Sequence, residues 1–268
     1  MRIRLLSNPG FYYFALMVLF LYLPIFLLVV FAFNDSVILS FPLKGFTLKW
    51  FQALPQAGTL LESVRNSLVV GLFSALGATV MGTLAAIAIT RHRIPGRDFF
   101  LAVGMMPLVI PYVVLGVALL ILFHNLGIPL SLWTVGASHI LVNIPYVMLI
   151  VAARLSEFDQ NLEEASMDLG ASYWGTLLRV TLPISAPALI AAFLSCFTTS
   201  FDEFTLAFFL TSTDNTLPVY LYSQLRFVGR LPIVVALAAL IMVVSILLLV
   251  ISEWLRRYGQ PKSFKRIV

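Results

Sequence analysis

Residues 163–170 of this chain read EEASMDLG, and residues 180–183 read VTLP. Both stretches lie in the longest polar segment between the hydrophobic runs. That segment holds four of the chain's twelve acidic residues, all between Asp159 and Asp168. Because charged groups are costly in lipid, this segment is the natural place for contacts with water or with other proteins.

The first stretch carries the signals of a short helix. Asn161 suits the N-cap, Glu164 stands where a capping-box carboxylate reaches back, and Gly170 is the natural C′ residue. At helical spacing one face is the least polar, with acids flanking it: Leu162, Ala165, Ser166 and Leu169, beside Glu163, Glu164 and Asp168. A second short helix is expected at about residues 172–180, ended by Pro183. We therefore predict a helix–Gly–helix on the membrane surface that docks onto a partner.

These residues resemble a known motif. Glu164-Ala165-Ser166, Gly170 and Val180-Thr181-Leu182-Pro183 match the cytoplasmic EAA loop of ABC importer permeases, where Glu-Ala-Ala precedes a Gly and then Ile-x-Leu-Pro. Ser166 replaces the second Ala and Val180 replaces the Ile. The stretches DLGAS (residues 168–172) and SFDEF (residues 200–204) resemble, more narrowly, the second permease of spermidine/putrescine-type importers. The resemblance covers nearly the whole chain.

The resemblance implies an all-α integral membrane fold, the type I ABC importer permease, with six transmembrane helices and a cytoplasmic coupling loop at about residues 154–184. It implies a bacterial inner-membrane location. The implied partners are a second homologous permease, two ATPase subunits that use ATP and Mg, and an extracytoplasmic solute-binding protein. This chain itself would bind no cofactor or metal and would not be an enzyme. The motif carries over these ATPase-coupling residues: Glu163, Glu164, Ala165, Ser166, Asp168, Leu169, Gly170, Leu182 and Pro183.

The composition excludes a soluble globular protein. Of 268 residues, 60% are hydrophobic and 11% are charged, whereas soluble domains carry about 25% charged residues. Runs of about twenty apolar residues recur, and each is long enough to cross a lipid bilayer as a helix. In such a protein the net charge of +5 reports topology rather than affinity for nucleic acid. The single cysteine, Cys196, excludes a disulfide scaffold and a zinc site.

Six apolar runs predict six membrane-spanning helices in one transmembrane domain, residues 1–268. The predicted spans are residues 11–33, 66–90, 99–123, 133–153, 186–210 and 232–252. Pro107 and Pro111 free backbone carbonyls in the third span, so we expect a bend there. The aromatic segment at residues 46–51 suits the membrane interface, although a plain tether fits equally well.

The basic residues are divided unequally between the two sides of the predicted membrane. Six spans put both termini on one side. That side carries twelve Lys and Arg residues, whereas the other side carries five. The positive-inside rule therefore predicts that both termini and the loop at residues 154–184 are cytoplasmic.

The sequence contains few candidates for catalytic, phosphate-binding or metal-binding residues. The chain has no Gly-x-x-x-x-Gly-Lys-Ser/Thr motif, so it lacks a phosphate-binding loop of its own. No Ser/His/Asp or metal-ligand grouping stands out. The three histidines are scattered. His139 lies inside the fourth predicted span, and we expect it to be a helix-packing residue rather than a gate or a solute contact.

Asp202 and Glu203 are the most informative polar residues within a predicted span, because intramembrane acids usually face a cavity or a partner. At 100° per residue the fifth span carries a polar stripe and an aromatic stripe about a third of a turn apart. The polar stripe is Ser195, Thr198, Thr199, Asp202 and Thr205, and the aromatic stripe is Phe197, Phe201, Phe204 and Phe208. A carboxylate beside aromatic rings suits a cationic amine. Asp202 is the stronger candidate for the solute path and Glu203 the weaker; a structural hydrogen bond is the alternative.

Two classes of function compete. The first is the membrane half of an ATP-driven importer, with a polyamine such as spermidine or putrescine as the favoured solute. The second is a self-sufficient secondary carrier or channel, with which six spans and intramembrane carboxylates are also compatible. The EAA spacing favours the first class, because a secondary carrier has no use for an ATPase dock. A membrane-embedded enzyme is third, because no catalytic constellation favours it.

Overall fold

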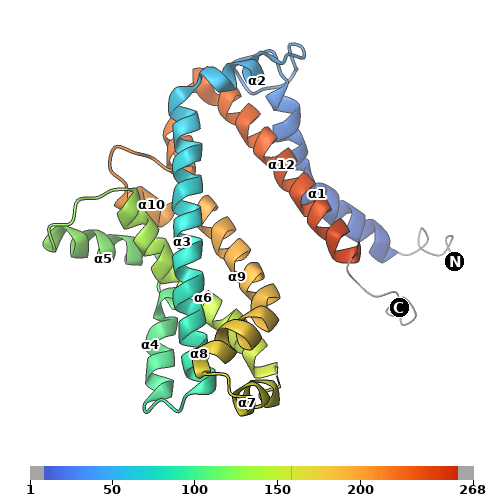
Figure 1. Ribbon diagram of the computed structural model, residues 1–268. Coiled ribbons are helices and arrows are strands. Elements are labelled where there is room, and N and C mark those ends of the chain that lie inside the picture. Colours follow the sequence, from blue (N-terminus) through green and yellow to red (C-terminus); the bar gives the residue numbers. More distant parts are fainter. Residues whose placement is uncertain (1–8, 158, 259–268) are drawn as a thin grey trace. The chain divides into compact units, whose positions relative to one another are not determined.

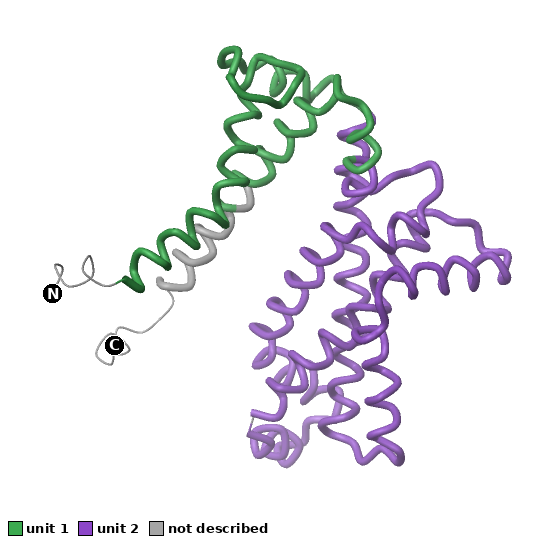
Figure 2. The backbone as a smooth tube through the Cα atoms, turned by 180° about the vertical axis from the view of Figure 1, so that it is seen from behind, with its two compact units in different colours: residues 1–58, 221–268 green, residues 59–220 purple. Residues whose placement is uncertain are grey.

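The computed structural model describes residues 9–157 and 159–258, which are mostly helical (Figure 1). Within these ranges the only β-type pairing is an isolated bridge between Asn34 and Phe46. The chain divides into two compact units, one of Met1–Gly58 with Leu221–Val268 and one of Thr59–Tyr220 (Figure 2). Several basic residues used in the topology prediction lie outside the described residues, namely Arg2, Arg4, Lys262, Lys265 and Arg266.

The first unit is built on two long apolar helices that lie side by side. Its helices are α1 (Pro9–Ala32), α2 (Lys49–Ala53), η1 (Leu54–Gln56), η3 (Val228–Arg230) and α12 (Leu231–Tyr258). The aromatic segment after α1 is folded rather than a plain tether, because α2 packs on α12. The indole Nε1 of Trp50 donates to the carbonyl oxygen of Asn34 over 2.9 Å, and Lys49 pairs with Asp35.

The second unit contains the polar segment and the acidic residues discussed above. Its helices are α3 (Gly58–Arg91), α4 (Arg97–Val109), α5 (Tyr112–Asn125), α6 (Leu132–Glu157), α7 (Asn161–Asp168), α8 (Tyr173–Thr176), η2 (Leu177–Thr181), α9 (Leu182–Asp202), α10 (Thr205–Leu210) and the start of α11 (Leu217–Gln224). Helices α3 and α6 approach closely at Gly82, where an added Cβ would lie 2.6 Å from the Cβ of Val147. Small residues allow this approach, as in other membrane helix pairs.

Four helices are long and apolar enough to cross a membrane, namely α1, α3, α6 and the continuous helix Tyr173–Asp202. If α4 and α5 count as one bent span, the number among the described residues is five. The first, second and fourth predicted spans are confirmed by α1, α3 and α6. Helix α12 covers the sixth predicted span.

The third predicted span, residues 99–123, is wrong as a single helix. Its two halves, α4 and α5, are bent by 105°. The break falls at Ile110, whose ψ of 127° is extended, and Pro111 caps α5. A proline disfavours the helical conformation of the residue before it and offers no N–H, so the predicted bend becomes a full break.

The fifth predicted span, residues 186–210, has different ends. We expected Pro183 to end the preceding helix, and this prediction is wrong. Pro183 lies in the first turn of α9, directly after the π-helical turn η2. A change of hydrogen-bond register at a π turn accommodates a residue without an N–H. The helix then stops at Asp202, and Glu203 is extended with ψ of 121°. Asp202 and Glu203 therefore lie at a helix break rather than in the middle of a span.

Candidate coupling loop and buried polar network

Helix α7 ends as the sequence predicts. Gly170 has a φ of +91°, in the left-handed region that favours glycine. Its N–H donates to Met167, and the N–H of Ala171 donates to Ser166, which is the Schellman pattern of a helix C-terminus. A Cβ on Gly170 would meet nothing within 4 Å. Glycine is therefore required within this chain by the backbone conformation, not by space.

The start of α7 differs from the prediction. The N-cap is Gln160, not Asn161, and no side chain caps the helix. Instead, an oxygen of Asp159 accepts from the N–H of Asn161 over 3.1 Å. Glu164 makes no capping box and is exposed. The second helix does start near the expected place, because Ser172 caps α8 by accepting from the N–H of Gly175.

Glu163, rather than Glu164, connects α7 to the rest of the unit. Its Oε2 lies 2.8 Å from Nε of Arg91, the last residue of α3. Its Oε1 accepts from the hydroxyl of Thr181 in η2 over 2.7 Å. Nη2 of Arg91 also donates to the carbonyl oxygen of Leu155 near the end of α6, over 3.1 Å. We call this cluster, Arg91, Glu163, Thr181 and the carbonyl of Leu155, the coupling-loop clasp.

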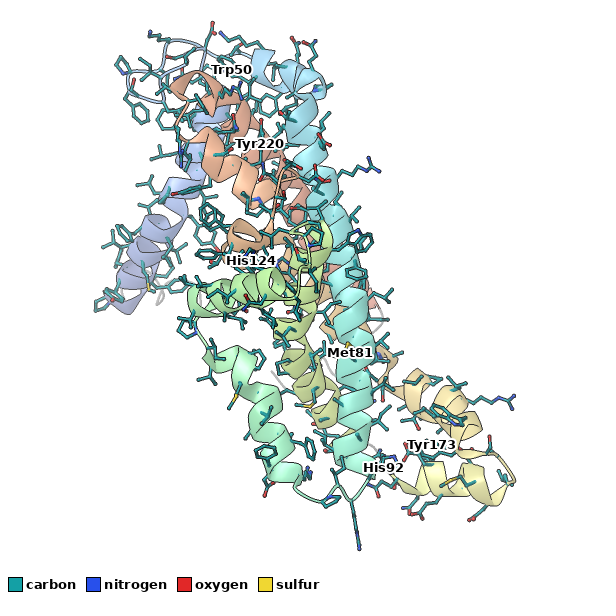
Figure 3. The ribbon with its side chains drawn as sticks, turned by 90° about the vertical axis from the view of Figure 1, so that its left-hand side faces the viewer. Trp50, Met81, His92, His124, Tyr173 and Tyr220 are labelled. Atoms are coloured by element: carbon teal, nitrogen blue, oxygen red, sulfur yellow. The ribbon has the colours of Figure 1, made fainter. Side chains whose placement is uncertain are left out.

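Two weaker contacts fasten the same region. Ser166 and Thr176 share a hydroxyl hydrogen bond of 3.0 Å between α7 and α8. Nε2 of His92 lies 3.3 Å from the hydroxyl of Tyr173, and Figure 3 shows the two side chains facing each other. Between α3, α7 and η2 remains a hollow of about 220 Å³, whose lining includes Gln160, Glu164 and Met167.

The outer face of this loop is apolar and exposed. Leu169 is 91% exposed and Trp174 is 65% exposed, and Leu162 is also exposed. Ala165 and Asp168 lie on the exposed surface as well. Two residues assigned to the coupling set by resemblance lie apart from this face, because Leu182 and Pro183 are in the first turn of α9. Leu182 packs against the unit's hydrophobic core.

A buried polar network lies within the second unit, where α9 stops. It joins four side chains: Ser74 of α3, His139 of α6, Ser200 of α9, and Glu203. The hydroxyls of Ser74 and Ser200 are 2.7 Å apart, and Nδ1 of His139 is 2.6 Å from Oγ of Ser200. Nε2 of His139 lies 3.2 Å from Oε2 of Glu203. With its proton on Nε2, His139 donates to Glu203 and accepts from Ser200.

Glu203 also holds the start of α10. Its two carboxylate oxygens accept four hydrogen bonds, of 2.7–3.2 Å, from the backbone N–H groups of Thr205, Leu206 and Ala207. These are N–H groups of the first turn, which have no partner within a helix. One buried carboxylate therefore stabilises the break between α9 and α10 and ties it to α6. His139 is buried and both of its ring nitrogens have partners, as expected of a helix-packing residue.

The two broken spans, α4–α5 and α9–α10, pack against each other. Helix α10 packs against α5, and Leu206 and Leu210 of α10 share one hydrophobic core with Leu115 and Leu119 of α5. Figure 1 shows α5 and α10 side by side. The two interrupted helices are therefore packed together at one level of the unit.

Asp202 is placed differently from Glu203. It is exposed, as are Thr198 and Thr199, while Ser195 is half-buried. Within the described ranges the carboxylate of Asp202 has no hydrogen bond or ion pair, whereas Thr198 donates back to Leu194. The predicted polar stripe is interrupted, because Thr205 belongs to α10.

The predicted aromatic stripe is divided in the same way. The rings of Phe197 and Phe201 are 6.0 Å apart on α9, and those of Phe204 and Phe208 are 5.4 Å apart across the start of α10. The aromatic pairs therefore flank the acidic pair on both sides of the break. Ser74 and Ser200 were missed by sequence reasoning, because a serine in an apolar run carries no signal of its partner.

The second unit therefore combines apolar helices long enough to cross a membrane with a short, exposed helix, α7, between two of them. Residues 78–259 match the family described as binding-protein-dependent transport system inner membrane components. This match covers more than half of the chain, so the protein belongs to that family. It is a multi-pass inner-membrane component of an ABC importer that works with other components of such a system.

Several proteins are similar to this chain. The spermidine/putrescine transport system permease protein PotC of Escherichia coli is 36% identical over 239 residues, 89% of this chain and 90% of the relative. The PotC protein of Haemophilus influenzae is 35% identical over 240 residues, covering 89% and 92%. The putrescine transport system permease protein PotI of Escherichia coli is 34% identical over 231 residues, covering 83% and 82%. These relatives are transport permeases.

One solved structure shares the fold. It is a crystal structure of a bacterial ABC transporter involved in the import of the acidic polysaccharide alginate. The match has a TM-score of 0.72 at 15% identity and covers 96% of this chain and 97% of the other. At this identity the likeness speaks for the fold alone.

Proposed function

We propose that this chain is one of two permease subunits of an ATP-driven importer of small organic cations, most specifically polyamines such as spermidine or putrescine. The observation that carries the proposal is the identity to spermidine/putrescine permeases over nearly the whole chain. Asp202 is exposed and lies in the sequence between two phenylalanine pairs. A carboxylate and aromatic rings are the groups that attract a cationic amine, through ion pairing and cation–π attraction.

The proposal includes the assembly around the chain. A second homologous permease lies against this one and completes the path, which Asp202, Thr198, Thr199 and Ser195 line from this side. Two ATPase subunits bind ATP and Mg, and one of them docks on the exposed apolar face of α7 and α8. An extracytoplasmic binding protein delivers the solute. No step of the hydrolysis uses residues of this chain.

The topology belongs to the same proposal. Six crossings, with α4 and α5 forming one crossing and α9 and α10 together forming another, put both termini in the cytoplasm. The excess of basic residues on that side supports this orientation. The loop at residues 154–184 is then on the ATPase side, and Asp202 lies deeper in the membrane.

Direct uptake tests the proposal. The chain is co-expressed with its partner permease, ATPase and binding protein, and ATP-dependent uptake of labelled putrescine, spermidine and other amines is measured in proteoliposomes. We expect uptake of a polyamine that needs ATP and the binding protein. Uptake without ATP would instead identify a secondary carrier. ATP-driven uptake of an uncharged or anionic solute alone would overturn the assignment of a cation.

A further inference from the structure

We infer that the coupling-loop clasp, and above all the ion pair of Arg91 with Glu163, transmits movement of α7 to the helices that form the solute path. The inference rests on the proposed function, since it concerns how an ATPase docked on α7 acts on the membrane helices. It makes Arg91 and Glu163 positioning residues for transport, although neither is expected to touch the solute.

The clasp links elements that are far apart in the sequence. Arg91 is the C-terminal residue of α3, a helix of 34 residues. Its guanidinium contacts Glu163 of α7 over 2.8 Å and the backbone of Leu155 in α6 over 3.1 Å. Glu163 in turn accepts from Thr181, which directly precedes α9. Three long helices, α3, α6 and α9, therefore meet α7 through one carboxylate and one guanidinium.

The clasp is shielded enough to act as a firm link. The side chains of Arg91 and Glu163 are only 10% and 14% exposed. Pairs of this kind are screened much less by salt than pairs at the surface, and breaking one leaves an uncompensated charge behind. Both carboxylate oxygens are engaged, so Glu163 cannot swing away without losing contacts to two elements at once.

The same helices carry the path. Helix α9 begins at Leu182, directly after Thr181, and runs to Asp202, and α3 and α6 supply Ser74 and His139 to the network that holds Glu203. A displacement of α7 that is transferred through the clasp therefore reaches the helix break beside Asp202 along continuous helices. Glu164, although it is the next residue, has no such connection, because its side chain is exposed.

Charge reversal tests the inference in the assembled complex. Uptake per ATP hydrolysed is measured in proteoliposomes for Arg91→Glu, Glu163→Arg and the double variant. We expect each single variant to lower this ratio about tenfold or more while ATP hydrolysis continues, and the double variant to recover most of the loss, as for directly interacting pairs. Arg93→Glu is the matched control, because Arg93 is exposed two residues further on; it should leave the ratio unchanged.

A second measurement does not depend on the solute. Amide hydrogen exchange over residues 161–170 of the full-length chain in detergent should rise about tenfold in Arg91→Gln and in Glu163→Gln, and should stay the same in Arg93→Gln. Unchanged exchange in both clasp variants, or single charge reversals that keep the wild-type ratio, would overturn the inference. Failure of the wild-type complex to import amines would instead overturn the proposed function and leave the exchange result standing.

Discussion

Two adjacent pairs of acidic residues, Glu163-Glu164 and Asp202-Glu203, divide their roles in the same way. In each pair one carboxylate is fastened by contacts to several helices and the other is exposed. Glu163 meets a guanidinium and a hydroxyl at a partly solvated helix end. Glu203 meets an imidazole and four backbone hydrogen bonds inside the unit.

In both pairs the local packing, not the residue type, decides which carboxylate is held by hydrogen bonds or an ion pair and which carboxylate is exposed. Neighbouring residues on a helix point about 100° apart, so only one of Glu163 and Glu164 can face the packed side of α7. In the second pair the helix break separates the two side chains, because Asp202 ends α9 and is exposed, whereas Glu203 is extended and buried. The fastened member holds the local geometry, and its exposed neighbour is the one that we propose to meet an ATPase in the first pair and a solute in the second. Substitutions at four positions break or sharpen this division.

The largest effect on transport is expected at the helix end beside the first pair. Gly170→Asp should abolish uptake while the chain still inserts, because a side chain at φ +91° is strained and the added carboxylate lies on the proposed ATPase dock. Gly170→Asn, which tolerates this φ better, should retain part of the uptake. Uptake assays paired with immunodetection in membranes measure both. Full transport by Gly170→Asp at normal expression would refute the dock.

The largest effect on stability is expected at Glu203. Glu203→Ala removes the acceptor for several buried N–H groups and for His139, so we expect a loss of about 3 kcal/mol or more. Asp202→Ala is the matched control and should change stability by less than about 0.5 kcal/mol. Unfolding of the purified complex in detergent measures both. If Glu203→Ala and Asp202→Ala lose the same amount of stability, the buried contacts of Glu203 do not set it apart from the exposed Asp202.

A selective effect on uptake is expected at Asp202. Asp202→Asn keeps the shape and hydrogen-bonding capacity but removes the charge. We expect amine uptake to fall about tenfold, equivalent to about 1.4 kcal/mol, with ATPase subunits still bound. Initial rates across a range of amine concentrations, together with co-purification, check this. If Asp202→Asn transports normally while Asp202→Ala disrupts assembly, Asp202 is a structural hydrogen-bond partner.

The smallest effect is expected at Glu164. Its side chain is exposed and makes no cap, so Glu164→Ala should lower uptake per ATP only about twofold to threefold, as for the loss of an exposed ion pair. The loss should be clearly smaller than that of Glu163→Arg in the same assay. A loss as large as that of the clasp variants would show that the two acids of this pair share one role.

Some of this protein could be predicted from the sequence because the signals are local. Long apolar runs predicted α1, α3 and α6, and the Gly170 stop followed from the conformational freedom of glycine. The motif around Glu164 and Gly170 indicated the importer family, to which the chain belongs. Local signals also misled: Asn161 does not cap α7, and Pro183 opens a helix instead of ending one.

The sequence by itself therefore determined the class of fold, the main apolar helices and the place of the surface helix, because hydrophobic length and turn chemistry act within a few residues. Only the tertiary structure decided that the fifth span breaks at Glu203 and that Glu163 rather than Glu164 is fastened. No glycine or proline marks the break near Glu203. Its partner, His139, lies 64 positions away in the chain, and Arg91 lies 72 positions from Glu163. Contacts between residues so far apart in the sequence form only when the helices pack, so no local sequence pattern predicts them.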